Sequence, residues 1–134
     1  LAFGVLWGFA VLFLIHVNNF SHILTSYQAG ILNTMTRMGF DKAQKFLIVW
    51  WSVFCVLWFI YHYYYASLIW TIFGTLLLVI WSLPLFNKII KIRSPLGSDL
   101  DMIRKDAYRT FLMMTFILFS ENFWYVGEKL NWTL

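Results

Sequence analysis

Residues 17–43 read VNNFSHILTSYQAGILNTMTRMGFDKA, a polar stretch that separates two strongly hydrophobic runs. Before it, residues 1–17 (LAFGVLWGFAVLFLIHV) carry no Lys, Arg, Asp or Glu, and neither do residues 46–61 (FLIVWWSVFCVLWFIY) after it. A lone segment in hydrocarbon must satisfy its own backbone hydrogen bonds, which an α-helix does. The stretch is therefore predicted to connect two membrane-spanning helices, and it is the long segment with the most varied polar side chains.

The composition supports the same class of protein. Hydrophobic residues make up 61% of the chain and charged residues 12%, whereas soluble domains carry about 25% charged residues. A length of 134 residues allows about four spans of roughly 20 residues each. We predict an all-α integral membrane protein that forms a single helical membrane domain over residues 1–134, with an amphipathic loop before the last helix. The four spans are expected near residues 1–21, 45–62, 66–86 and 107–126.

Several residues mark the limits of these spans. The segment HYYYAS, residues 62–67, is predicted to be a tight turn whose tyrosines anchor at the lipid headgroups. Pro84 is expected to stop or kink the third span. Glu121 is expected to reach the interface near the end of the fourth. Gly4 and Gly8 have the spacing that lets a neighbouring helix approach closely.

The loop over residues 87–106 (NKIIKIRSPLGSDLDMIRKD) mixes basic, acidic and apolar residues. Its isoleucines predict a turn of helix lying on the membrane surface. Basic residues beside a membrane commonly contact lipid headgroups, and this role is predicted for Arg37, Lys88, Lys91 and Arg93. Asp99 and Asp101 are interpreted as members of solvated ion pairs rather than metal ligands.

The basic residues are distributed unevenly along the chain. With four spans, the first and third loops lie on the same side, and these loops and their edges contain nine of the ten Lys and Arg residues: Arg37, Lys42, Lys45, Lys88, Lys91, Arg93, Arg104, Lys105 and Arg109. The positive-inside rule places this side in the cytoplasm, matrix or stroma. We therefore expect a bacterial cytoplasmic membrane or an organelle inner membrane. Because topology explains the net charge of +4, no nucleic-acid partner is predicted.

The start of the chain and its single cysteine give little information about function. The first residue is Leu rather than Met and lies inside an apolar run, so the start is expected to be trimmed, processed or not observed. No signal-peptide pattern is visible. The single cysteine, Cys55, excludes an internal disulfide or a cysteine-based metal site.

The central stretch and the hydrophobic runs after it resemble the second half of the UbiA superfamily of intramembrane prenyltransferases, most closely the quinone-biosynthesis type. The similarity is carried by Asn18-Asn19, Ala29-Gly30, Arg37-Met38-Gly39, Ala43 and the Leu83-Pro84-Leu85 exit from the third run. It covers nearly the whole chain but about half of such an enzyme. It implies the final helices of that fold.

The resemblance also implies that the family's chemistry has been lost. The positions that correspond to the second aspartate motif are Asn19, His22 and Ser26, and the positions of a basic pair are Ile31 and Leu32. The family uses carboxylates to hold Mg²⁺ against a prenyl diphosphate, and neutral side chains do not supply the anionic oxygens that this ion prefers. The expectation is a pseudoenzyme, with no catalytic residue and no metal site.

The histidines offer a separate hypothesis. His16 lies within the first apolar run, and an ionisable residue inside a span is a functional candidate. It could ligate haem or another pigment together with a residue from another helix or subunit, or it could simply reach the interface. On a helix, His16 and His22 fall on different faces because they are six residues apart.

Three functional classes remain open on these observations. The leading prediction is a non-catalytic structural subunit of a multi-subunit membrane complex of respiratory or photosynthetic type, packed against partner helices and lipid. The alternatives are a diverged or partial prenyltransferase of the UbiA type and a haem- or pigment-binding anchor subunit. No cofactor is specified by the sequence, and structural lipids are expected.

Overall fold

The computed structural model describes residues 2–65, 67–96 and 99–129, and every element of secondary structure in them is a helix. Four helices are long: α1 (Ala2–Ser21), α4 (Phe40–Tyr65), α5 (Leu68–Lys91) and α6 (Asp99–Lys129). Two short helices, α2 (Ile23–Gln28) and α3 (Thr34–Met38), lie between α1 and α4. The predicted all-α fold is confirmed.

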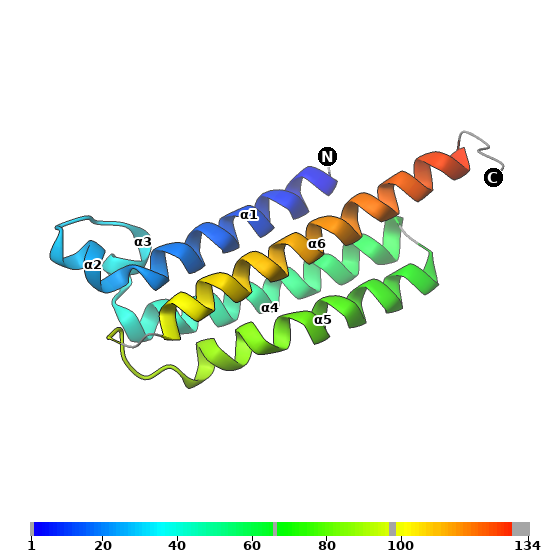
Figure 1. The fold of residues 1–134 in the computed structure, drawn as a ribbon. Coiled ribbons are helices and arrows are strands. Elements are labelled where there is room, and N and C mark those ends of the chain that lie inside the picture. Colours follow the sequence, from blue (N-terminus) through cyan, green and yellow to red (C-terminus); the bar gives the residue numbers. More distant parts are fainter. Residues whose placement is uncertain (1, 66, 97–98, 130–134) are drawn as a thin grey trace.

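The long helices form a bundle in which helices that are consecutive along the chain lie side by side (Figure 1). Helix α1 contacts α4 and α6, and α5 also contacts α4 and α6, so the four helices close into a ring. The α1–α4 and α5–α6 connections lie at one end, here called the loop end. The short α4–α5 connection lies at the other end, called the tyrosine end after residues 63–65.

The core of the bundle is built from residues spaced three or four apart, which fall on one face of a helix. In α4 the buried residues are Ala43, Leu47, Trp51, Phe54, Trp58 and His62. The buried residues of α5 include the small residues Thr71, Gly74 and Ser82. A Cβ placed on Gly74 would lie 3.7 Å from the His62 ring, so a small residue at this position lets α4 and α5 pack closely.

The outward surfaces of the bundle are also apolar. Exposed aliphatic side chains include Val49, Val53 and Val56 on α4. On α6, Leu112 and Phe116 are 65% and 66% exposed. A helix of a water-soluble bundle would be polar on this face. Three helices, α1, α4 and α5, are long and apolar enough to cross a membrane, whereas α6 does not reach the same mean hydropathy.

The central polar stretch is more helical than the sequence suggested. Helix α1 continues to Ser21, and α3 begins at a capping box in which the Asn33 side chain accepts from the Thr36 amide and Thr36 Oγ1 accepts from the Asn33 amide. Gly30 and Gly39 have φ values of +70° and +76°, a conformation that glycine adopts without strain. The stretch is therefore a folded cap over the loop end, not an extended linker.

The structure corrects the expected turn at residues 62–67 and shows which helix contains Pro84. Residues 62–65 belong to α4, so the tight turn expected at HYYYAS shrinks to the connection around Ser67, whose side chain caps α5 by accepting from the Trp70 amide at 3.4 Å. Helix α5 continues through Pro84 to Lys91, so Pro84 does not stop the helix, which was one of the two effects predicted for it.

The prediction for the isoleucines of the loop over residues 87–106 is wrong for two of the three. Ile89 and Ile92 are buried, so the core stripe of α5 continues to the loop end, whereas Ile90 is exposed. Gln44 of α4 stabilises this end of α5 because its amide donates to the carbonyls of Ile89 and Ile92. These carbonyls belong to the last turn of the helix, where no intrahelical donor is left for them.

Candidate functional site

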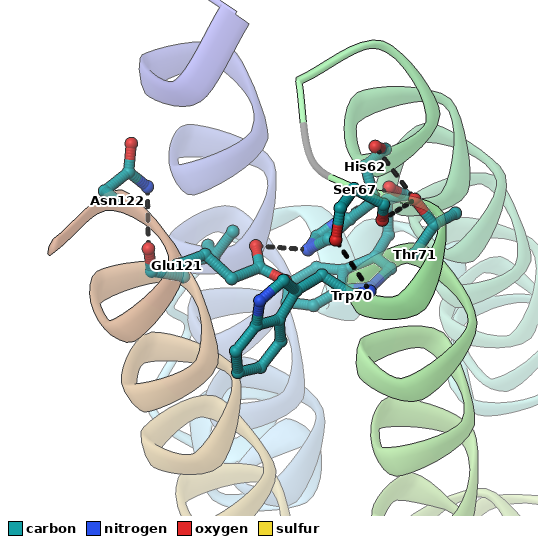
Figure 2. A network of polar contacts seen from close by, with 8 residues as sticks. His62, Ser67, Trp70, Thr71, Glu121 and Asn122 are labelled. Atoms are coloured by element: carbon teal, nitrogen blue, oxygen red, sulfur yellow. Dashed lines mark hydrogen bonds and ion pairs between the residues drawn. The ribbon is translucent and has the colours of Figure 1, made fainter. Parts of the chain in front are cut away.

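A buried ion pair joins α4 to α6 near the tyrosine end of the bundle. His62 Nε2 lies 2.7 Å from Glu121 Oε2, and the two side chains are 0% and 7% exposed. This separation is within the range of an ion pair or of a hydrogen bond between neutral partners. Figure 2 shows Glu121 reaching from α6 toward the imidazole. Burying ionisable groups is costly unless they are paired, which makes this pair the strongest candidate site in the described part of the chain.

The backbone of α4 fixes the orientation of the His62 ring. Nδ1 lies 2.8 Å from the carbonyl oxygen of Trp58, one helical turn earlier. A carbonyl can only accept, so Nδ1 carries a proton. The Trp58 indole also stacks on the imidazole with a centroid separation of 4.4 Å. The ring is therefore held from one side by a hydrogen bond and over one face by an aromatic contact.

This geometry requires a proton between His62 Nε2 and the Glu121 carboxyl group. With Nδ1 protonated, a neutral His62 presents a bare lone pair at Nε2, and an ionised Glu121 presents another lone pair 2.7 Å away. Two acceptors at that distance repel, so one proton must reside on Nε2 or on Glu121. In either arrangement the pair has no net charge, which is the form that a low-dielectric interior tolerates.

Helix α5 packs against the His62–Glu121 pair through Gly74. A Cβ placed on Gly74 would lie 3.3 Å from Glu121 Oε1 and 3.7 Å from His62 Cδ2 and Nε2. The hydroxyl of Thr71, one turn earlier, donates to the backbone carbonyls of His62 and Ser67 at 3.0 Å. Gly74 thus makes room for the pair, and Thr71 ties the start of α5 to the end of α4.

Other polar atoms of this region are buried without a hydrogen-bond partner. They include Glu121 Oε1, the indole Nε1 of Trp58 and the hydroxyl of Thr75. Beside them, Asn122 donates through its side chain to the Leu118 carbonyl at 2.6 Å. The site therefore combines one ion pair with additional hydrogen-bonding capacity in an interior that is otherwise apolar.

The sequence interpretation misplaced both members of the pair, assigning His62 to an interfacial turn and Glu121 to the membrane surface. A signal was present for His62, because it continues the three- and four-residue spacing of Leu47, Trp51, Phe54 and Trp58. Glu121 continues the buried series of α6 through Thr110, Met114 and Ile117 in the same way. Periodicity does not predict how far α4 and α6 are shifted relative to each other along the bundle axis, and this shift brings the two side chains to the same level.

The structure separates the three positions that resemble the aspartate motif. Asn19 borders a surface pocket of about 560 Å³ together with Asn33, Thr34 and Arg37. His22 turns elsewhere, with Nε2 2.9 Å from Arg104 Nη1 on α6. Ser26 lies in α2 and joins neither contact. The exposed Ile31 and Leu32 occupy the positions of the basic pair.

His16 is packed by aromatic rings from α4. Its imidazole lies edge-on to Phe46 at 5.3 Å and to Trp50 at 5.2 Å between ring centroids. Its Nδ1 is buried and has no hydrogen-bond partner. The contacts place His16 against α4 and away from the pair at the tyrosine end.

The predicted headgroup-contact residues lie at the loop end, but they differ in their contacts. Lys88 pairs with Asp106, so its charge is neutralised within the bundle. Lys91 and Arg93 are exposed. Arg37 is exposed beside the pocket that contains Asn19. Asp101 pairs with Arg104 at 3.1 Å, as expected for a solvated ion pair.

Over the described residues, no group of three or more His, Cys, Asp and Glu side chains is arranged to hold a metal ion. Comparison with protein-family models gives no match. Comparisons with curated proteins and with solved structures give no significant match either.

Proposed function

We propose that this chain is a non-catalytic structural subunit of a multi-subunit membrane complex of respiratory or photosynthetic type. The observation that carries the proposal is the apolar outer surface of the bundle. Val53 of α4, Leu76 of α5 and Leu112 of α6 are all more than 40% exposed, although each belongs to the apolar part of its helix. Such a surface is stable against lipid tails or partner helices and unstable against water.

A fourth span, formed by α6, is part of this proposal. The segment from Thr110 to Ser120 contains no Lys, Arg, Asp or Glu, and its exposed positions carry Leu112, Phe116 and Phe119. Most of the charged residues that lower its mean hydropathy lie near the loop end, Glu121 is paired inside the bundle, and Glu128 and Lys129 end the helix at the opposite side. With four spans, both basic connections face the cytoplasm, matrix or stroma.

Helix-to-helix contact with other subunits is supported at α1. A Cβ on Gly4 or Gly8 would meet no atom within 4 Å, so no described helix of this chain occupies that face. Two small residues four apart let another helix approach closely in a membrane. We infer that a partner helix packs there, and that lipid covers the remaining apolar surface.

The resemblance to UbiA-type prenyltransferases bears on ancestry in this proposal. Asn19, His22 and Ser26 supply no carboxylate, and His22 is engaged with Arg104. Mg²⁺ held against a diphosphate needs anionic oxygen ligands. We infer a bundle that has kept the packing of such an enzyme's last helices without its metal chemistry.

The test is extraction in mild detergent, native separation and mass spectrometry of the proteins that migrate with the chain. We expect stoichiometric co-migration with subunits of an energy-converting complex. Gly8→Leu, which blocks the small-residue face of α1, should release the chain from that assembly, while Val53→Leu should not. Migration alone, or prenyl transfer that depends on Mg²⁺, would overturn the proposal.

An absorption spectrum of the same purified material addresses the haem- or pigment-binding alternative. A band that disappears in His16→Phe would favour an anchor subunit that binds such a group. A spectrum of aromatic residues alone fits the structural subunit.

A further inference from the structure

We propose that the groove between α5 and α6 near the loop end binds the phosphate of an anionic phospholipid, with Arg109 as the principal ligand. This inference rests on the proposed membrane placement of α6. It does not depend on the identity of any partner subunit. The groove has a volume of about 200 Å³ and is lined by Ile80, Trp81 and Pro84 of α5 and by Asp106, Arg109 and Thr110 of α6.

The charges in the groove leave Arg109 uncompensated. Asp106, which lines the groove, is held by Lys88 from α5. Asp106 is the only acidic residue among those lining the groove, and no ion pair joins Arg109 to any described residue. Lys88, Asp106 and Arg109 together carry one net positive charge. A phosphodiester, which carries one negative charge, complements this cluster.

The contact with Trp81 places the guanidinium at the groove. Arg109 Cζ lies 5.8 Å from the centroid of the Trp81 ring, which is within the range of a cation–π contact. The five N–H donors of arginine lie in the guanidinium plane. Two of them can therefore meet two phosphate oxygens in the bidentate arrangement that favours arginine over lysine.

The position of the groove suits a lipid rather than a free anion. Arg109 is the last basic residue of α6 before the uncharged segment 110–120, which places it where the charged loop end meets the apolar surface. Beyond it at the loop end lie exposed Lys91 and Arg93. Toward the tyrosine end, Phe73 and Leu76 of α5 and Phe116 of α6 continue the same helix faces and are more than half exposed. Acyl chains attached to the bound phosphate would lie against these residues.

The experiment measures lipid retained by the purified chain. The protein is incorporated into nanodiscs of phosphatidylglycerol and phosphatidylcholine, extracted in mild detergent and examined by native mass spectrometry. We expect wild type to retain one phosphatidylglycerol that Arg109→Gln loses, with occupancy reduced at least about fivefold. Lys42→Gln, which removes the same charge from an exposed position on α4 outside the groove, should retain it. Arg109→Lys should give intermediate occupancy because it keeps the positive charge but loses the bidentate pair of N–H donors.

Competition with inorganic phosphate separates the two sources of this chemistry. Bound lipid should survive millimolar phosphate, whereas displacement by phosphate would indicate a free-anion site and overturn the lipid assignment. Equal loss in Arg109→Gln and Lys42→Gln would show a diffuse charge effect and would also overturn it. Circular dichroism of each variant confirms the helical fold. Because the chain alone is used, failure here leaves the co-migration test of the proposed function unaffected.

Discussion

At the scale of single residues, the His62–Glu121 pair makes a specific prediction about Glu121. Because a single proton lies between His62 Nε2 and the Glu121 carboxyl group, an amide at position 121 can take the place of that carboxyl group. In Glu121→Gln the amide donates to His62 Nε2 while Nδ1 continues to donate to the Trp58 carbonyl. We expect Glu121→Gln to stay within about 1 kcal/mol of wild type. Glu121→Ala, which leaves Nε2 without a partner, should lose about 3 kcal/mol. Unfolding free energies in mixed micelles measure both.

The control for this prediction removes both partners. His62→Leu/Glu121→Leu replaces the pair with apolar side chains, and it should recover most of the stability that either single change loses. If the double variant is as unstable as the sum of the single variants, the two side chains are not coupled. Nitrogen NMR of the Glu121→Gln imidazole should show a proton on Nδ1 and none on Nε2.

Gly74 carries a second prediction at this scale. In Gly74→Ala the new methyl would lie 3.3 Å from Glu121 Oε1, and the carboxyl group cannot withdraw without leaving His62. We expect a loss of about 1 kcal/mol or more from overpacking. Gly8→Ala is the matched control, because its Cβ meets nothing within 4 Å. In the isolated chain it should be neutral or stabilising, and equal losses at both sites would contradict the assigned role of Gly74.

At the scale of elements, the last turn of α5 depends on a side chain from α4. Gln44→Leu removes the amide that donates to the Ile89 and Ile92 carbonyls. We expect a loss of about 1 kcal/mol and faster hydrogen exchange in the last turn of α5. Gln28→Leu, an exposed change at the end of α2, should alter neither. Unchanged exchange in Gln44→Leu would show that α5 is terminated by other contacts.

The existence of the helices could be predicted from the sequence, but their limits could not. Uncharged runs long enough to span a membrane identified α1, α4 and α5, because in hydrocarbon the helix has no competitor. The end of α4 was misjudged because interfacial tyrosines are equally compatible with a turn and with a last helical turn. Pro84 was expected to stop or kink the third span, but it lies inside α5 and does not stop the helix. One missing hydrogen bond is tolerated when neighbouring helices hold the chain.

At the scale of the whole molecule, the antiparallel order predicts which residues share a side of the membrane. Starting from Cys55→Ala, single cysteines at Ser26 and Ser94 should react with a membrane-impermeant reagent from the side that carries the basic loops. Cysteines at Ser67 and Asn122 should react from the opposite side. Labelling of Asn122→Cys together with Ser94→Cys from one side would contradict the fourth span. Detergent-solubilised protein provides the control for reactivity.

The candidate site itself belongs to this scale, which explains why the sequence did not predict it. His62 and Glu121 lie on different helices, and their meeting requires the ring of four helices and the relative heights of α4 and α6. The loop-end cluster of basic residues needed only the order of the spans. Local periodicity carries a signal that each member of the pair is buried, although the sequence interpretation did not use it, and the complete bundle is needed to bring the two side chains together.

The closed ring has a consequence for biogenesis. Each long helix contacts the long helix before it along the chain, and α6 completes the ring by contacting both α5 and α1. As synthesis proceeds, α1, α4 and α5 can associate in order, and until α6 arrives the polar edge of His62 has no counterpart. The pairing with Glu121 therefore marks the completion of the bundle. A chain interrupted before residue 121 would leave His62 without the partner that its burial requires.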